Sequence, residues 1–218
     1  MIIIHGASMS PFVRKTLAIA HEKGIEFEHR VGEFGKPTPD FLAASPVRKI
    51  PALTHGDYTL ADSSAIIHYL DALQPEPSMI PSEPRARGKV VWWDEYADTY
   101  LIANAMGPIF FNRFVAPHVF GRPGDLAAAE KAQAEALPPM LDYLESVVTG
   151  EGFLVEDRFT LADAAIASPF VNLGHLGIRP DPATYPKLSA YLAAIHARPS
   201  FASYIAGESR FVARLAAA

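Results

Sequence analysis

The chain has 218 residues, a formal net charge of −5 and an isoelectric point near 5.9. Half of its residues are hydrophobic and a fifth are charged, which is usual for a globular protein and argues against long disordered tracts. A mildly acidic chain is a poor general binder of nucleic acid, because affinity for phosphate backbones comes mainly from lysine and arginine. There is no cysteine, so disulfides, thiolate zinc sites, iron–sulfur clusters and protein-borne thiol chemistry are excluded.

The start of the chain does not have the pattern of a signal peptide, because it has no charged first segment and its apolar run is short. No stretch approaches the ~20 apolar residues that are needed to cross a bilayer. The histidines do not have metal-ligand spacing, so no metal site is expected. We therefore expect a soluble, cytoplasmic protein that binds neither membranes nor nucleic acid.

The N-terminal third alternates between strand and helix patterns. Ser10-Pro11 is a typical helix start after an apolar β-branched run, and Gly24 is a typical helix end. The strands are expected at residues 1–5, 27–31, 50–54 and 58–60, and the helices at residues 11–24, at residues 40–44 and from Asp62 or Ser63 onward. The order β-α-β-α-β-β-α predicts a small mixed sheet with helices on its faces.

A proline-rich segment follows, and beyond it only helical patterns are seen. Four prolines in close succession make this linker extended and stiff. Helices are expected at residues 85–108, 109–117, 125–150, 160–173 and 185–197, with a short segment after Pro199. The predicted organisation is an α/β domain over residues 1–75, a linker over 76–84 and an all-α helical bundle domain over 85–218.

Ser10 lies where a strand gives way to a helix. Considered alone, it is an ordinary N-cap residue. The position also suits thiolate chemistry, because a helix N-terminus attracts anions and a hydroxyl that donates to a thiolate lowers the pKa of the thiol. Ser8 is an alternative hydroxyl, but only Ser10 adjoins the proline that opens the helix.

Two further motifs lie at the ends of predicted strands. In Lys49-Ile50-Pro51, a cis proline would leave the preceding N–H and C=O exposed to bind an extended peptide, whereas the alternative is an ordinary edge-strand proline. Asp62 at a helix start can accept an ammonium group, and Ser63 with the first helical amides can hold a carboxylate. The alternative for this second motif is again a helix cap.

A fourth motif is structural in our interpretation. Thr160 and Asp163 have the spacing of a capping box, in which side chains and backbone amides at a helix start satisfy one another. Replacing either residue is expected to lower stability by ~1 kcal/mol or more.

Taken together, these motifs resemble the soluble glutathione transferases over essentially the whole chain. The segments S-P-F-V-R-K, S-P-V-R-K-I-P-A-L, L-A-D-S-S-A-I and F-T-L-A-D-A-A-I-A occur in this order, with the proline linker before the last. The resemblance implies a thioredoxin-like domain docked on a helical bundle, usually in a homodimer, with glutathione as the co-substrate. Two departures are Asp62, where glutamate is common, and Ser45-Pro46, where Asn-Pro is common.

The resemblance also implies roles for individual residues. By this resemblance, Ser10 would donate a hydrogen bond to the glutathione thiolate, and Lys49 would approach the glycine carboxylate. The backbone of Ile50, beside a cis Pro51, would pair with the cysteinyl part of glutathione. Asp62 and Ser63 would hold the γ-glutamyl end. Asp163 would be the folding-related helix cap of the family.

The second substrate is expected to be a small hydrophobic electrophile bound between the domains. Candidate walls are Met9, Phe34, Trp92, Tyr96, Tyr100, Phe110 and Phe211, although each aromatic could equally belong to the core. For the dimer, the resemblance implies that the hairpin and the helix from Ser63 face the helix from Arg85.

The predicted activity is conjugation of the glutathione thiolate to that electrophile. Without cysteine the protein cannot form the mixed disulfides that a thioltransferase needs. A glutathione-dependent isomerase, dehalogenase, ether-cleaving enzyme or peroxidase remains an alternative, as does a non-catalytic protein that binds ligands or docks a partner. The role of the enzyme, in detoxification or in a dedicated catabolic pathway, also stays open.

Overall fold

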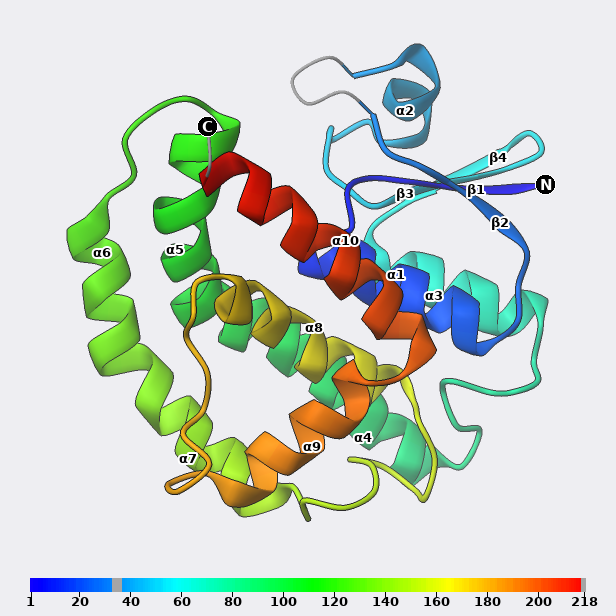
Figure 1. The fold of residues 1–218 in the computed structure, drawn as a ribbon. Coiled ribbons are helices and arrows are strands. Elements are labelled where there is room, and N and C mark those ends of the chain that lie inside the picture. Colours follow the sequence, from blue (N-terminus) through cyan, green and yellow to red (C-terminus); the bar gives the residue numbers. More distant parts are fainter. Residues whose placement is uncertain (33–36, 217–218) are drawn as a thin grey trace.

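The computed structural model describes residues 1–32 and 37–216 of the chain (Figure 1). A four-stranded sheet in the order β2-β1-β3-β4 forms the N-terminal domain. The strands are β1 (Ile2–His5), β2 (Phe27–Arg30), β3 (Ala52–His55) and β4 (Tyr58–Ala61). β1 and β2 are parallel, and β3 runs antiparallel to both of its neighbours. This mixed sheet confirms the predicted thioredoxin-like α/β fold.

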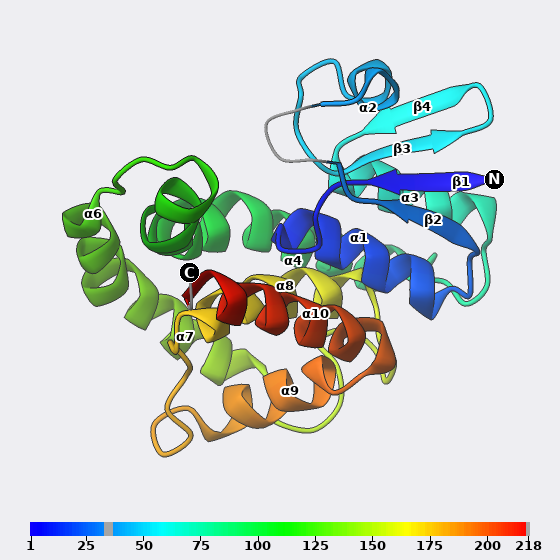
Figure 2. The same cartoon turned by 45° about the horizontal axis from the view of Figure 1, so that its top comes forward.

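Two helices cover one face of the sheet, as Figure 2 shows below the strands. They are α1 (Pro11–Glu22) and α3 (Ser63–Leu73), while the short α2 (Pro39–Ala44) lies beyond the other face. Alternate residues of β1 point toward the helices, so Ile2 and Ile4 are buried against Leu17 and Ile66. This core explains why the first strand is a run of isoleucines.

The C-terminal domain is entirely helical in the described residues. Its elements are α4 (Pro84–Glu95), η1 (Tyr96–Met106), α5 (Gly107–Phe110), η2 (Phe111–Val119), α6 (Leu126–Lys131), η3 (Ala132–Ala136), α7 (Leu137–Val147), α8 (Leu161–His175), α9 (Pro186–His196) and α10 (Pro199–Ala216). Of these, α8 lies at the centre and is buried from Leu161 to Leu173. It packs against α1, α4 and α10, and so joins the two domains (Figure 1).

Three segments, labelled η, are π-helical and were not expected. Each lies beside or contains a proline, namely Pro108, Pro117 or Pro138. A proline has no N–H to donate to the preceding turn, and a wider turn is one way for the chain to adapt.

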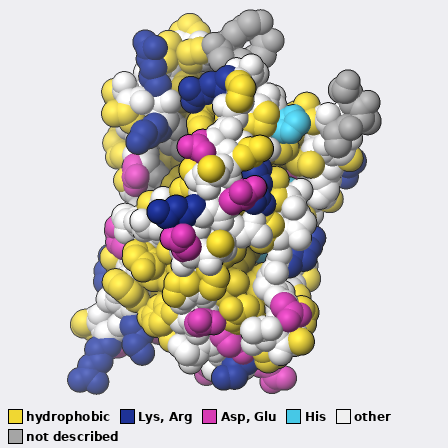
Figure 3. All heavy atoms as spheres, turned by 90° about the vertical axis from the view of Figure 1, so that its left-hand side faces the viewer, with side chains coloured by type: hydrophobic (Ala, Val, Ile, Leu, Met, Phe, Trp, Pro, Cys, Tyr) yellow, Lys and Arg dark blue, Asp and Glu magenta, His cyan; other side chains and the backbone are white. Residues whose placement is uncertain are grey.

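Seen from the side of α6, hydrophobic side chains gather in the lower half of the molecule between charged ones (Figure 3).

The segment after Pro199 was predicted to be short, and this prediction is wrong. α10 has 18 residues and crosses the molecule beside α1 and α8. Its sequence has weak helix formers such as Gly207, but Phe201 and Glu208 are buried against the rest of the protein. Tertiary packing therefore extends a helix that local propensity does not support. None of the described helices is long and apolar enough to cross a membrane.

Candidate active site

A cleft of about 1050 Å³ lies at the end of the sheet where α1 and α3 begin. Its other side is formed by η2 and by Phe120, which follows it. Six residues that the sequence predicted to contact glutathione line this one cleft: Ser10, Lys49, Ile50, Pro51, Asp62 and Ser63. They come from three separate segments of the chain, and the sheet topology brings those segments together.

Ser10 is the N-cap residue of α1 and has an extended backbone. Its carbonyl accepts the first helical hydrogen bond, from the N–H of Arg14 at 2.9 Å. Its hydroxyl does not cap the helix, so it can donate into the cleft instead. A positive helix end and a hydroxyl therefore occupy the same point of the cleft wall.

Ser8 lies outside this lining. Its hydroxyl interacts with the buried carboxylate of Glu208 in α10. Burial alone would raise the pKa of Glu208. The positive charge of Arg14 and the polar contacts from His175, Arg14 and Ser8 outweigh burial, so the pKa of Glu208 is lowered from its usual value. The structure thus brings Ser10 to the cleft and turns Ser8 toward the C-terminal helix.

The second segment enters the cleft at the start of β3. The Ile50–Pro51 peptide is cis. The fully buried Ser45 holds the backbone before it, since its Oγ donates to the carbonyl of Lys49 at 2.7 Å and accepts from the N–H of Lys49 at 3.0 Å. Ser45 therefore fixes this segment, a role that was not predicted from the sequence.

Gly6 allows Ile50 to approach the loop before α1. Gly6 has a φ of +131°, and a Cβ placed on it would lie 2.7 Å from Val13 and 2.9 Å from the Cβ of Ile50. Such distances are too short for any side chain at this position. The close contact between two segments of the cleft thus depends on a glycine.

The third segment is the start of α3. Asp62 has a φ of 82°, which is unusual for a residue with a side chain, and its carboxylate accepts from the N–H of Ala65 at 3.0 Å. Asp62 is exposed and Ser63 is buried. A negative group and the N-terminus of an 11-residue helix therefore lie side by side.

The charges along the cleft are unevenly distributed. Asp62 is the single acidic residue of the described lining, whereas Arg30, Arg48 and Lys49 are cationic. Arg30 is paired with Glu28 at 2.8 Å, so Arg48 and Lys49 are the cations left for a ligand. The lining suits an extended molecule with an ammonium group near Asp62 and a carboxylate near Lys49. Arg48 was not predicted from the sequence as a ligand contact.

His5 forms part of the cleft floor. It is buried, and its Nε2 lies 3.1 Å from Oγ1 of Thr54. Burial, with Arg30 nearby, lowers the pKa of His5, so the ring is neutral at physiological pH.

A buried charge cluster lies behind the start of α3. Lys15 Nζ pairs with Asp94 and Asp98, both at 2.6 Å, and Ser64 Oγ donates to Asp94 at 2.6 Å. Burial raises the pKa of Asp98 to about 6, with Asp94 and Asp62 adding to the effect and Lys15 opposing it. One oxygen of Asp98 is buried and has no hydrogen-bond partner among the described residues.

The apolar wall differs from the predicted one. The aromatic and aliphatic side chains that line the cleft are Phe12, Phe41, Val47, Phe111, Val115 and Phe120. Phe111 and Val115 are four residues apart in η2, and their neighbour Phe110 is buried and stacked on Phe114 at 5.0 Å. A pattern of adjacent phenylalanines cannot tell which one faces a cleft.

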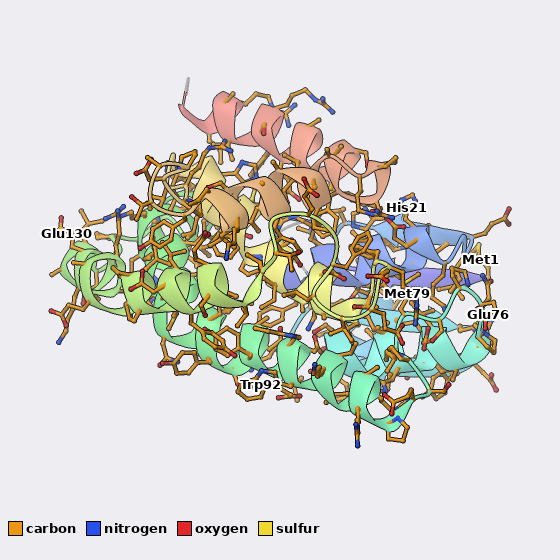
Figure 4. All side chains as sticks on the ribbon, turned by 90° about the horizontal axis from the view of Figure 1, so that it is seen from below. Met1, His21, Glu76, Met79, Trp92 and Glu130 are labelled. Atoms are coloured by element: carbon orange, nitrogen blue, oxygen red, sulfur yellow. The ribbon has the colours of Figure 1, made fainter. Side chains whose placement is uncertain are left out.

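None of the described residues that were predicted as walls lines this cleft. Trp92, Tyr96 and Tyr100 line a separate groove of about 420 Å³ with Tyr143 of α7, and Trp92 lies at the edge of the molecule (Figure 4). Phe110 belongs to the core, while Met9 and Phe211 are not among the lining residues. Phe34 lies outside the described residues. These three candidate walls from α4 and η1 therefore face the separate groove and not the cleft.

The start of α8 has the predicted capping geometry. The carboxylate of Asp163 accepts from the N–H of Thr160 at 2.9 Å and from its hydroxyl at 3.1 Å. It also accepts from the N–H of Leu154 at 2.9 Å and from the hydroxyl of Tyr191 at 2.8 Å. Asp163 is fully buried and joins three segments of the helical domain.

The fold is a thioredoxin-like domain beside a helical domain, and the lining of the cleft suits a small charged molecule. The family described as "Glutathione S-transferase, N-terminal domain" matches residues 4–78, and "Glutathione S-transferase, C-terminal domain" matches residues 114–208. The chain belongs to the glutathione S-transferase family. This confirms the resemblance found in the sequence, and with it the enzyme class, a glutathione transferase.

Individual relatives agree. "Glutathione S-transferase 3" of Zea mays is 34% identical over 209 residues, covering 93% of this chain and 92% of the relative. The rice protein "Probable glutathione S-transferase GSTF2" (Oryza sativa subsp. japonica) is 29% identical over 202 residues, with 90% and 92% covered. The crystal structure of glutathione transferase F7 from Populus trichocarpa has a TM-score of 0.80 at 27% identity, covering 95% of this chain and 99% of that one.

Proposed function

We propose that this glutathione transferase binds glutathione along the cleft and conjugates its thiolate to a small hydrophobic electrophile. One observation carries the proposal: the Ser10 hydroxyl, unused in capping, shares a cleft with Lys49, Ile50, Asp62 and Ser63. These groups offer a thiolate donor and partners for both charged ends of a tripeptide.

Glutathione is proposed to lie extended between α3 and the segment before β3. Its ammonium group meets Asp62, and its γ-glutamyl carboxylate meets Ser63 and the amides at the start of α3. The backbone of Ile50, beside Pro51, pairs with the cysteinyl residue. Lys49 is proposed to approach the glycine carboxylate, with Arg48 as a second cation.

In the proposed reaction, the Ser10 hydroxyl and the N-terminus of α1 stabilise the thiolate. The thiol proton leaves to water, sulfur forms a bond to the electrophilic carbon, and the leaving group departs with its electron pair. Rate enhancement would come from the lowered thiol pKa and from holding the thiolate beside the second substrate. Lining residues of η2, Phe111 and Val115, support an apolar electrophile on the other side of the cleft.

We further propose a cytoplasmic homodimer that acts on foreign electrophiles. The absence of cysteine fits a reducing compartment. Exposed apolar side chains support a dimer contact between the hairpin and α3 of one chain and the helix formed by α4 and η1 of the other. These side chains are Tyr58, Leu73, Trp92 and Tyr100. We also propose the domain bounds given above, with the α/β domain over residues 1–75, the linker over 76–84 and the helical domain over 85–218.

The experiment is glutathione titration by calorimetry on the wild type, Asp62→Asn and the control Asp57→Asn. Asparagine tolerates the positive φ of Asp62 and keeps an oxygen for Ala65, so this change removes only the charge. We expect Asp62→Asn to bind roughly tenfold more weakly. Asp57, exposed in the hairpin turn, should have no effect.

A conjugation assay with an activated aromatic halide follows, with organic hydroperoxides and isomerisable substrates as rival assays. Turnover of the halide that depends on glutathione supports the proposal. If the wild type does not bind glutathione at millimolar concentration, the site is wrong. If it binds but supports only a rival reaction, the conjugation step is wrong.

A further inference from the structure

The segment that carries Ser10 is held from both sides by the central helix of the other domain. Asn172 Nδ2 donates to the carbonyl of Met9 at 2.8 Å. Ser168 Oγ donates to the carbonyl of Pro11, also at 2.8 Å. The two accepting residues are the immediate neighbours of Ser10 in the chain, and both donors lie on α8, one helical turn apart.

A buried arginine fixes the direction of the Asn172 amide. Arg14 is wholly buried, and its Nη1 donates to Asn172 Oδ1 at 2.9 Å and to the carbonyl of Ser168 at 2.7 Å. Because a guanidinium can only donate, the amide oxygen must face Arg14 and the amide nitrogen must face Met9. The Asn172 side chain is thus held in a single orientation.

The arginine is held in turn from α10. Arg14 Nε and Nη2 donate to the carboxylate of Glu208 at 3.1 and 2.6 Å, a bidentate pair. Both residues are buried, and His175 Nε2 lies 3.0 Å from the same carboxylate. The buried charge of Arg14 is therefore matched by that of Glu208, and this pair holds Arg14 in place against Asn172.

We propose that Asn172 and Ser168 are positioning residues for catalysis, which set the place of the Ser10 hydroxyl by fixing the carbonyls on either side of it. This rests on the proposed function, in which Ser10 donates to the glutathione thiolate. Neither side chain lines the cleft, so neither contacts glutathione. A donor acts on an anion only within hydrogen-bond distance, and a shift of about 1 Å can cost up to ~100-fold in rate.

Two substitutions remove one donor each. Asn172→Asp keeps an oxygen for Arg14 but places an oxygen, with no proton to donate, against the carbonyl of Met9. Ser168→Ala removes the bond to Pro11 and a long contact of 3.4 Å between Arg14 Nη1 and the Ser168 hydroxyl, and it leaves the backbone bond from Arg14 intact. The matched control is Ser200→Ala, which also removes a buried hydroxyl bond between α1 and a C-terminal helix, to Glu22 at 2.5 Å, but at the opposite end of α1.

The readouts are the pKa of bound glutathione, from the ultraviolet absorbance of its thiolate against pH, and the separate values of kcat and of the dissociation constant for glutathione. We expect Asn172→Asp and Ser168→Ala to raise the bound thiol pKa by about 1 and to lower kcat about 10-fold. Glutathione affinity should change by less than about 3-fold, because Lys49, Ile50 and Asp62 are untouched. Ser200→Ala should change none of these quantities.

A double variant separates positioning from general damage. If Ser168 acts through Ser10, Ser10→Ala/Ser168→Ala should have the same thiol pKa and kcat as Ser10→Ala. Additive effects in the double variant, or unchanged values in both folded single variants while Ser10→Ala is impaired, would overturn the positioning role alone. If Ser10→Ala leaves the thiol pKa and kcat unchanged, the role of Ser10 and the present inference both fail.

Discussion

We expect Asp98 to lower the stability of the folded state more at neutral pH than at mildly acidic pH. It shares Lys15 with Asp94, so the buried cluster contains two carboxylates and one cation. One oxygen of Asp98 is buried without a partner in the described part of the chain. The pKa raised from 3.8 to about 6 corresponds to about 3 kcal/mol of penalty for the ionised form.

The sign follows from proton linkage. Between about pH 4 and pH 6 the folded state binds the proton at Asp98 more tightly than the unfolded state does, so this group lowers stability as pH rises. Above pH 7 the penalty is fully present, and below pH 4 it is absent. Asp98→Asn removes the charge at nearly constant volume, and the cation of Lys15 keeps Asp94 as its partner.

We expect Asp98→Asn to be more stable than the wild type by about 2–3 kcal/mol at pH 8, with the difference vanishing near pH 4. The assay is urea unfolding of the wild type and Asp98→Asn at several pH values and one protein concentration. The difference between their unfolding free energies cancels the contributions of titratable groups that both proteins share. As a contrast, Asp94→Ala should destabilise by about 1–3 kcal/mol, because Ser64 and Lys15 lose a partner. A difference that is flat with pH, or a less stable Asp98→Asn at pH 8, would refute the reasoning.

Three other outcomes are expected. Asp163→Ala should lower the unfolding free energy by roughly 3–5 kcal/mol, because the buried donors of Thr160, Leu154 and Tyr191 lose their acceptor. Urea unfolding measures this loss, and a value under about 1 kcal/mol would contradict the prediction. Gly6→Ala should displace Ile50 and weaken glutathione binding at least tenfold in calorimetry, whereas unchanged affinity would mean that the strand tolerates the Cβ. Phe111→Ala should raise KM for an apolar electrophile about 5-fold or more while glutathione affinity stays constant, and the reverse pattern would move the second substrate elsewhere.

The sequence was sufficient for the sheet and for the six predicted glutathione contacts that line the cleft, because both depend on local signals. Each predicted glutathione contact sits at the end of a strand or the start of a helix, as with Ser10 before α1 and Asp62 before α3. Turn and cap residues mark such places directly. The element order then determines which ends meet, so local motifs predict a shared cleft.

The aromatic wall could not be predicted in the same way. Tyr96 and Phe111 are both aromatic residues of π-helical segments in one domain, and hydrophobic periodicity identifies a face without saying what it opposes. Tyr96 points to a groove shared with Tyr143, whereas Phe111 reaches the cleft. That choice depends on how the helices pack against the sheet domain.

The charged pair Arg14-Lys15 shows a deeper limit. A helix pattern places two adjacent charges toward solvent, yet both side chains are buried. Their partners lie far along the chain, Glu208 for Arg14 and Asp94 with Asp98 for Lys15. A buried charge is tolerated only when it is paired, so burial of these cations could not be inferred without the contacts.

These pairs also give α1 a double role. One face of α1 packs on the sheet through Leu17, while Arg14 and Lys15 hold carboxylates of the helical domain. Moving the domains apart would leave two buried cations and three carboxylates without partners, at a cost of several kcal/mol for each broken pair. The domains should therefore move as one body when ligands bind. Adaptation to an electrophile then falls to the wall formed by η2 and not to the Ser10 end of the cleft, which the same charge pairs hold in place.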